Sequence, residues 1–93
     1  MVCILTLHLH LPGCDSLKEK RGRIKPLLHR LQREFNLSVA EMGQQDKWRE
    51  AVVACAMVGN DAAYLQSALQ KVIHWIEANW PDADLVDHHL ELV

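Results

Sequence analysis

The sequence predicts one α+β domain in which four strands and two helices follow the order βαββαβ. Residues 1–11 and 84–93 alternate apolar with polar side chains, which is typical of strands that are covered on one face. Residues 16–35 and 61–80 carry apolar side chains at helical spacing. Between these two helices, residues 48–58 form an almost continuous apolar run, which is typical of a central strand.

The first strand has two unlike faces and ends at Pro12-Gly13. One face is apolar and carries Cys3, Leu5, Leu7, Leu9 and Leu11. The other face is more polar and carries Val2, Ile4, Thr6, His8 and His10. The apolar face is therefore expected to lie on the core.

The first helix has a strong start signal, because Ser16 and Glu19 have the spacing of a capping box. Its apolar stripe comprises Leu17, Ile24, Leu27, Leu28, Leu31 and Phe35. Pro26 lies well inside the helix, where a proline removes one backbone donor. We therefore expect one helix with a kink near residues 23–25 rather than two separate helices.

The remaining elements follow from their boundaries. Residues 37–42 are predicted as a short strand, and residues 43–47 as a polar turn before the strand at 48–58. Asn60 or Asp61 caps the second helix. The apolar stripe of that helix comprises Leu65, Leu69, Val72 and Ile76.

These elements fit the ferredoxin-like plait. In that arrangement four antiparallel strands form a sheet in the order 4-1-3-2, and both helices cover the same face. The order agrees with the sequence, because the first and third strands are the most apolar and become central. Residues 1–93 contain no linker, repeat or low-complexity tract, and at 49% hydrophobic they predict a single small domain.

Charge is distributed unevenly along the chain. The net charge is −2, but residues 17–33 carry +6 and the rest of the chain carries −8. The basic groups of the first helix are Lys18, Lys20, Arg21, Arg23, Lys25, Arg30 and Arg33. Because a local basic patch attracts phosphate even on an acidic protein, these seven residues are the predicted nucleic-acid-binding site, with structured RNA or a ribonucleoprotein as partner. The alternative is a solvated helix face whose charges pair with acids such as Glu41 or Glu50.

Three of these cations, Lys18, Lys20 and Arg21, stand in the first turns of the helix. The helix dipole disfavours positive charge there by about 0.3 to 1 kcal/mol. Something outside the helix must offset this cost, either a carboxylate elsewhere in the fold or a bound anion. The positions of the carboxylates therefore decide between a salt-bridge network and an RNA contact.

Stacking of RNA bases on the sheet is not expected. Domains that read RNA on a sheet stack bases on aromatic side chains of the central strands. The first strand has no Phe, Tyr or Trp, and the third has only Trp48 at its start. The predicted contact is therefore made by the first helix with the RNA backbone.

Histidines are the second group of interest. His8 and His10 would lie near His89 if the last strand pairs with the first, and imidazole is a ligand of zinc and iron. These three residues are weak metal candidates, because no residue order here matches a metal motif. The chain also lacks a phosphate-binding loop and a nucleophile elbow. We expect a non-catalytic protein without metal or cofactor, and a metal-dependent enzyme built on the histidines is the weaker alternative.

The uncovered face of the sheet favours a different function. Val2, Ile4, Thr6 and Leu85 are predicted to share that face. Leaving an apolar face in water is unfavourable, and pairing it with the same face of a second copy is an economical solution. A homodimer, or another protein interaction through this face, is therefore the main alternative to RNA binding.

Cysteine usage and hydropathy predict the location of the protein. Cys3, Cys14 and Cys55 are odd in number and share no CxxC spacing, which favours buried thiols in a reducing cytoplasm. No apolar run approaches the roughly 20 residues of a membrane span. The first residues lack the basic region of a secretory signal. A cytoplasmic protein without membrane contact is expected.

Four segments carry a resemblance to a known family: Leu11-Pro12-Gly13, SLKEKR at 16–21, FNLSVAE at 35–41 and DKWREA at 46–51. They resemble the YlxP-like family of small bacterial proteins, a domain of unknown function, over essentially the whole chain. The resemblance implies a ferredoxin-like fold. Through gene neighbourhood with translation initiation factor two and ribosome-binding factor A, it also implies a link to translation or ribosome assembly. Pro26 and Cys14 depart from the family pattern, which bears on local geometry.

Overall fold

The computed structural model describes residues 1–43 and 46–93. Its elements are β1 (Val2–His10), α1 (Leu17–Glu34), β2 (Ser38–Glu41), β3 (Glu50–Val58), α2 (Ala62–Asn79) and β4 (Asp84–Leu92). The predicted βαββαβ order is therefore confirmed. The polar turn predicted at 43–47 includes Gln44 and Gln45, which lie outside the described residues.

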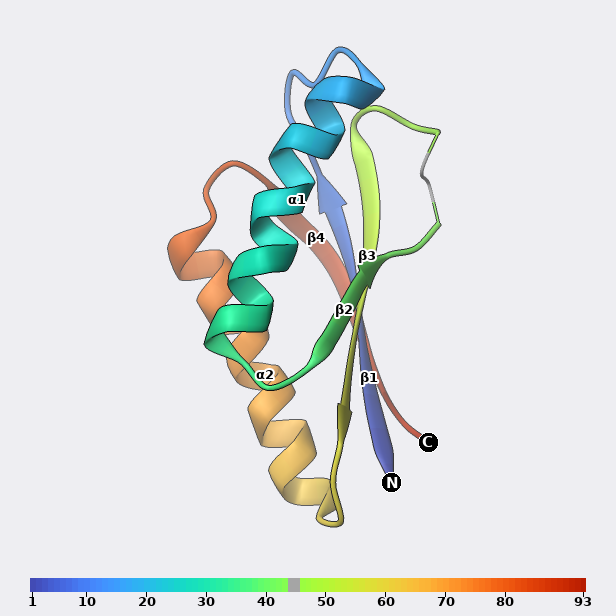
Figure 1. The fold of residues 1–93 in the computed structure, drawn as a ribbon, viewed down its shortest axis with the longest axis vertical. Coiled ribbons are helices and arrows are strands. Elements are labelled where there is room, and N and C mark those ends of the chain that lie inside the picture. Colours follow the sequence, from blue (N-terminus) through green and yellow to red (C-terminus); the bar gives the residue numbers. More distant parts are fainter. Residues whose placement is uncertain (44–45) are drawn as a thin grey trace.

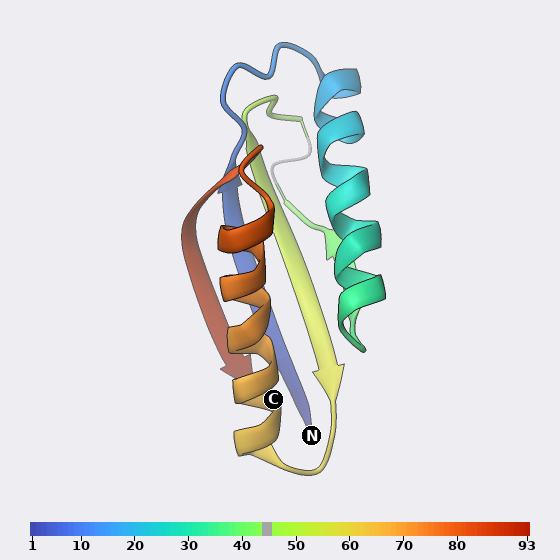
Figure 2. The same cartoon turned by 90° about the vertical axis from the view of Figure 1, so that its left-hand side faces the viewer.

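The four strands form one antiparallel sheet in the order β2-β3-β1-β4 (Figure 1). This is the predicted 4-1-3-2 order read from the opposite edge. The central strands β1 and β3 pair along their whole length, from Val2 opposite Val58 to His10 opposite Glu50. Figure 2 shows α1 and α2 side by side on one face of this sheet, as the α+β plait requires.

The core lies between the sheet and the two helices. The alternate residues of the central strands that face the helices are buried: Cys3, Leu5, Leu7, Leu9, Ala51, Val53, Cys55 and Met57. The helices meet them with their predicted stripes, which are buried at Ile24, Leu27, Leu31, Leu65, Leu69, Val72 and Ile76. The periods of two and 3.6 in the sequence therefore identify the covered faces correctly.

Both helices begin at a side-chain cap. Ser16 Oγ accepts a hydrogen bond from the Glu19 amide at 3.0 Å, and Asp61 Oδ1 accepts one from the Tyr64 amide at 3.2 Å. From its cap α1 runs through Pro26 as one continuous helix, which confirms the prediction of a single helix.

β4 differs from the prediction in the direction of one side chain. The register shifts between His8 and Leu9, so that Asp87 lies opposite His8 but Leu85 lies opposite Leu9. Val86 is the extra residue of this bulge and is 61% exposed. Because one extra residue reverses the alternation, Leu85 packs against the core. The assignment of Leu85 to the uncovered oligomer face is therefore wrong.

Candidate nucleic-acid interface

The seven cations of α1 divide into two groups by direction. A helix turns by 100° per residue, so cations that are neighbours in the sequence face different surroundings. The inner cations, which contact other parts of the fold, are Lys20, Arg23 and Arg30. The outer row, which is exposed to solvent, is Lys18, Arg21, Lys25 and Arg33.

Lys20 is held inside the molecule. Its side chain is 2% exposed, and its Nζ lies 3.1 Å from Oε2 of Glu41 on β2. The same ammonium group donates a hydrogen bond to the carbonyl oxygen of Lys47 at 2.8 Å. These contacts join α1 to β2 and to the segment that precedes β3. Lys20 is therefore out of reach of an outside phosphate, and its assignment to the nucleic-acid site is wrong, because Glu41 supplies the negative charge from within the fold.

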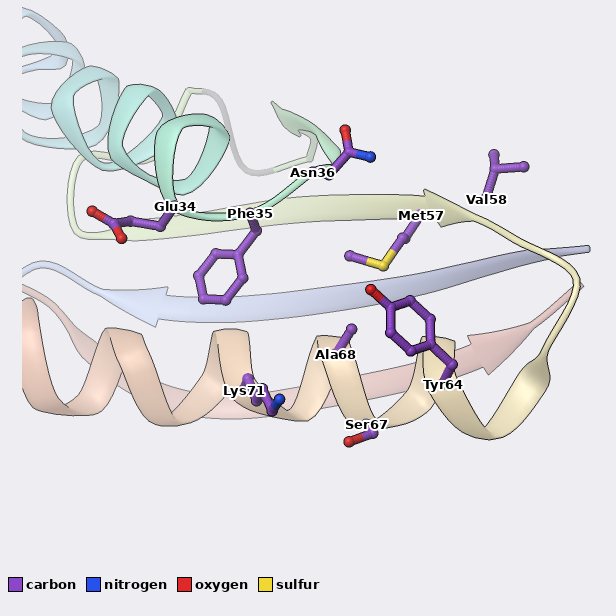
Figure 3. Close-up of a pocket in the computed structure, with 9 residues that line it drawn as sticks. All are labelled: Glu34, Phe35, Asn36, Met57, Val58, Tyr64, Ser67, Ala68 and Lys71. Atoms are coloured by element: carbon purple, nitrogen blue, oxygen red, sulfur yellow. The ribbon is translucent and has the colours of Figure 1, made fainter.

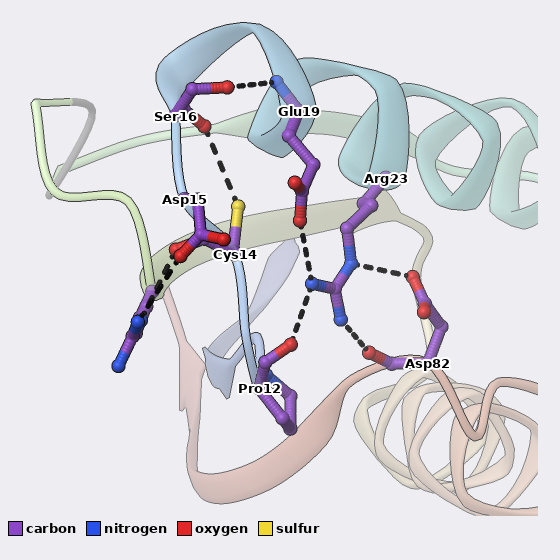
Figure 4. A network of polar contacts seen from close by, with 8 residues as sticks. Pro12, Cys14, Asp15, Ser16, Glu19, Arg23 and Asp82 are labelled. Carbon is purple, nitrogen blue, oxygen red and sulfur yellow. Dashed lines mark hydrogen bonds and ion pairs between the residues drawn. The ribbon is translucent and has the colours of Figure 1, made fainter.

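Arg23 is tied to two loops at one end of the sheet, the loop that follows β1 and the loop that precedes β4 (Figure 4). Its Nε lies 2.9 Å from Oδ2 of Asp82, and its Nη2 donates to the carbonyl oxygen of Asp82 at 2.6 Å. Its Nη1 donates to the carbonyl oxygen of Pro12 at 2.8 Å and lies 3.4 Å from Oε2 of Glu19. Burial lowers the pKa of the guanidinium, but the hydrogen bonds with Asp82 and Glu19 and the nearby negative charge, mainly that of Asp82, together outweigh this and raise the pKa. Arg23 is a structural cation, so its assignment to the nucleic-acid site is also wrong.

Arg30 links the two helices. Its Nη2 lies 3.6 Å from Oε1 of Glu34, and its guanidinium carbon lies 5.4 Å from the centre of the Trp75 ring on α2. A guanidinium over an aromatic ring is attracted by the ring's negative face. The side chain is 43% exposed. Arg30 is therefore the most exposed of the inner cations, since it has partners in the fold and still reaches solvent.

The outer row forms a continuous basic face. Its four cations are exposed and follow one another at intervals of three, four and eight residues, so that they share one side of the helix: Lys18, Arg21, Lys25 and Arg33. Exposed His29 lies between the last two. At 1.5 Å per residue this row is about 22 Å long. Among residues 1–43 and 46–93, none of the four cations forms an ion pair. The two acids of α1, Glu19 and Glu34, pair with inner cations instead.

A shallow hollow of about 240 Å³ opens beside the outer row. Arg21 and Lys25 border it, Ile24 and Leu28 form its apolar floor, and Glu41 closes it toward β2. A flat apolar group next to a phosphate would find both a surface to lie on and a cation on either side. The hollow therefore presents an apolar surface that is bordered by two cations and one carboxylate.

The three histidines are not brought together as one set of metal ligands. His8 lies opposite Asp87, and His89 stands two residues further along β4. His10 Nδ1 lies instead 3.2 Å from Oε1 of Glu50 on β3. Over the parts of the chain that the structure describes, no three His, Cys, Asp or Glu side chains are placed to hold a metal ion.

The uncovered sheet face keeps three of its four predicted residues. Val2, Ile4 and Thr6 are half-buried there, and Ala56 and Ala54 of β3 lie opposite Ile4 and Thr6. A shallow apolar depression on β2 and β3 is lined by Ser38, Val39, Ala40, Ala54 and Ala56. The middle of this face is therefore apolar, and its β4 edge carries histidine and acid.

Comparison with known proteins agrees with the resemblance seen in the sequence. The family described as "Protein of unknown function (DUF503)" matches residues 2–90. The chain belongs to this family. It is also similar to "Uncharacterized protein YlxP" of Bacillus subtilis (strain 168), with 38% identity over 63 residues, which are 68% of either chain. The DUF503 description names no reaction, so it assigns no catalytic residue to the chain.

One cavity of the DUF503 chain was not indicated by its sequence. It has a volume of about 320 Å³ and lies between the end of α1, the end of β3 and the start of α2 (Figure 3). Phe35, Met57 and Ala68 contribute apolar surface, while Tyr64 and Lys71 border it from α2. The only signal in the sequence is the spacing of Tyr64 and Lys71 on one helix face, which is too common to predict a cavity.

The three cysteines of this family member lie inside the fold. Cys3, Cys14 and Cys55 are buried and free, as predicted. Burial raises the pKa of the Cys55 thiol to about 12 and also raises the pKa of Cys3. A thiol that stays protonated is a poor nucleophile and metal ligand.

Of the helices in the described residues, none has the length and apolar character needed to cross a bilayer.

Proposed function

We propose that this DUF503 protein is a non-catalytic, cytoplasmic protein that binds structured RNA through the outer row of α1. The observation that carries the proposal is the division of the cations on one helix. Lys20 and Arg23 are neutralised by carboxylates of the same chain. The outer row is exposed and, within the described residues, has no ion-pair partner. Its charges are therefore available to phosphate, and the release of counterions from RNA supplies the affinity.

The distribution of charge supports binding by this face alone. A straight basic row about 22 Å long can contact several phosphates along one strand or across one groove. Outside residues 17–33 the chain carries −8, which repels a polyanion from the other faces. The link to translation that the family resemblance implies makes ribosomal RNA the first probe.

Titration with ribosomal RNA at several salt concentrations tests the proposal. Three or four phosphate contacts should give a slope of log affinity against log salt of about −3. Replacing Lys18, Arg21, Lys25 and Arg33 together by glutamine should abolish binding at physiological salt. For a single lysine-to-glutamine change within the row, Lys71→Gln is the matched control, because Lys71 is an exposed lysine of α2 outside the row.

The quadruple variant should fold normally, because its four side chains are exposed. Equal RNA binding by this variant and the wild type would reject the outer row as the site. Absence of binding by the wild type at low salt would reject RNA binding altogether. Binding to an acidic protein with no RNA affinity would assign the row to a different class of partner.

The uncovered sheet face supports self-association as a second candidate function. Its middle is apolar, and its β4 edge carries His89 between Asp87 and Glu91. In a two-fold symmetric dimer, imidazoles of one copy could face carboxylates of the other. Light scattering at tens of micromolar should then show a dimer that Ala54→Glu converts to a monomer. A wild-type monomer at that concentration would reject this candidate.

A further inference from the structure

Gly22 lies on the same exposed side of α1 as the outer row. It lies in the interior of α1, four residues after Lys18 and three before Lys25, and it is exposed like both of them. Glycine inside a helix destabilises it relative to alanine, because glycine loses more conformational freedom on folding. A glycine at the centre of an exposed, functional face therefore calls for a physical reason.

The described part of the chain supplies no such reason. Gly13 is the one described glycine with a positive φ, so Gly22 does not use the conformations that other residues avoid. A β-carbon at Gly22 would meet nothing within 4 Å apart from the adjacent backbone of the helix. The glycine thus weakens α1 without allowing a closer contact within the described protein.

Pro26 removes the regular hydrogen-bond donor of the Gly22 carbonyl. In an α-helix the carbonyl of residue 22 accepts from the amide of residue 26, and proline has no amide hydrogen. Both residues are exposed and lie inside α1. Two features that weaken a helix therefore coincide in the middle of the cation row: a missing side chain and a carbonyl without its usual partner.

We propose that the Gly22 carbonyl accepts a hydrogen bond from a ribose 2′-hydroxyl of the RNA bound by the outer row. RNA presents phosphates and 2′-hydroxyl donors together, whereas DNA lacks the donor. Lys18, Arg21 and Lys25 lie within one helical turn of Gly22 and hold the flanking phosphates. The missing side chain allows the ribose to approach the main chain. This inference rests on the proposed function and specifies RNA rather than DNA as the ligand.

Three hairpins of one sequence test the inference: RNA, the same RNA with 2′-O-methyl riboses, and DNA. The 2′-O-methyl RNA keeps the phosphates and loses the hydroxyl donor. The wild-type protein should bind the RNA about fivefold to tenfold more tightly than the 2′-O-methyl RNA, as expected for the loss of one hydrogen bond. The RNA and its 2′-O-methyl form should show the same salt dependence, because both present the same phosphate contacts.

Gly22→Ala is the decisive variant. It should raise the Tm by about 4 °C, because alanine stabilises a helix interior. It should also lower the RNA affinity about fivefold and remove the preference for RNA over 2′-O-methyl RNA, because the methyl group of the alanine side chain blocks the approach of the ribose to the main chain. Gln32→Ala, on the same exposed side of α1, is the matched control and should leave that preference unchanged.

Pro26→Ala examines the carbonyl separately. It restores the amide hydrogen, so the Gly22 carbonyl becomes paired within the helix. The expected result is a higher Tm and a lost preference for RNA over 2′-O-methyl RNA, with the salt dependence unchanged.

The outcomes separate the two proposals. A lower Tm for Gly22→Ala would show that glycine serves the helix itself, and this would overturn the inference. An unchanged RNA preference in Gly22→Ala would overturn it too, while loss of binding by the outer-row variant would still support RNA binding. If the wild type binds none of the three hairpins, or the outer-row variant binds as well as the wild type, both proposals fail.

Discussion

The inner and outer cations of α1 have the same chemistry and opposite surroundings. Lys20 and Arg21 are adjacent in the sequence, yet Lys20 is buried beside Glu41 while Arg21 is exposed to solvent. A turn of 100° separates them. The lesson is that the number of basic residues on a helix does not measure its attraction for nucleic acid. What counts is the charge that remains after the carboxylates of the same fold have paired.

The largest effect is expected at Lys20. Lys20→Ala should lower the free energy of unfolding by about 3 kcal/mol, because it leaves the buried oxygen of Glu41 without its ammonium partner. Urea denaturation measures this loss. The adjacent Arg21→Ala is the control and should change stability by less than about 0.5 kcal/mol. Similar losses in the two variants would break the division into inner and outer cations.

Arg23 should come second. Arg23→Ala removes hydrogen bonds to Asp82 and Pro12 that hold α1 against two loops, and should cost about 2 kcal/mol of stability. Thermal unfolding should show a fall in Tm of about 10 °C. Arg33→Ala, the same change on the outer row, should leave the Tm nearly unchanged. A Tm of Arg23→Ala that matches the wild type would return Arg23 to the candidate RNA site.

Arg30 should give an intermediate result, because its side chain has partners and is still 43% exposed. Arg30→Gln should lower the free energy of unfolding by about 0.5 to 1 kcal/mol through the lost contact with Trp75. A double-mutant cycle with Trp75→Leu measures the coupling between the two side chains. Zero coupling would show that the ring contributes nothing, and Arg30 would then join the outer row.

Lys25 should have the smallest effect on stability and a clear effect on binding. Lys25→Gln should change the free energy of unfolding by less than about 0.5 kcal/mol, because Lys25 is exposed. It should reduce the salt slope of RNA binding by about 1. Lys71→Gln should leave that slope as it is in the wild type. A loss of stability without a change in slope would mean that Lys25 serves the fold.

Much of the fold follows from local patterns. The alternation in β1, the apolar run in β3 and the caps at Ser16 and Asp61 each depend on residues that are close in the sequence. The bulge at Val86 does not, because it arises where β4 is fitted to β1. It reverses the alternation, and for this reason Leu85 was placed on the wrong face of the sheet.

The candidate site was predictable only in outline. The basic helix is visible in the sequence, and so is the conflict between its first cations and the helix dipole. Which cations have partners in the fold is not visible, because those partners lie far along the chain: Lys47 is 27 residues from Lys20, and Asp82 is 59 residues from Arg23. The histidines illustrate the same limit, since His10 meets Glu50 of β3 rather than His89.

The sequence by itself determined which segments are helices and strands, which of their faces are apolar, and that α1 carries a large excess of positive charge. Those properties depend on the order of neighbouring residues and on the fixed periods of helix and strand. Only the tertiary structure decided which cations are neutralised, because pairing requires a carboxylate within about 4 Å. That proximity is set by the path of the whole chain. It leaves Lys18, Arg21, Lys25 and Arg33 facing solvent and encloses Lys20.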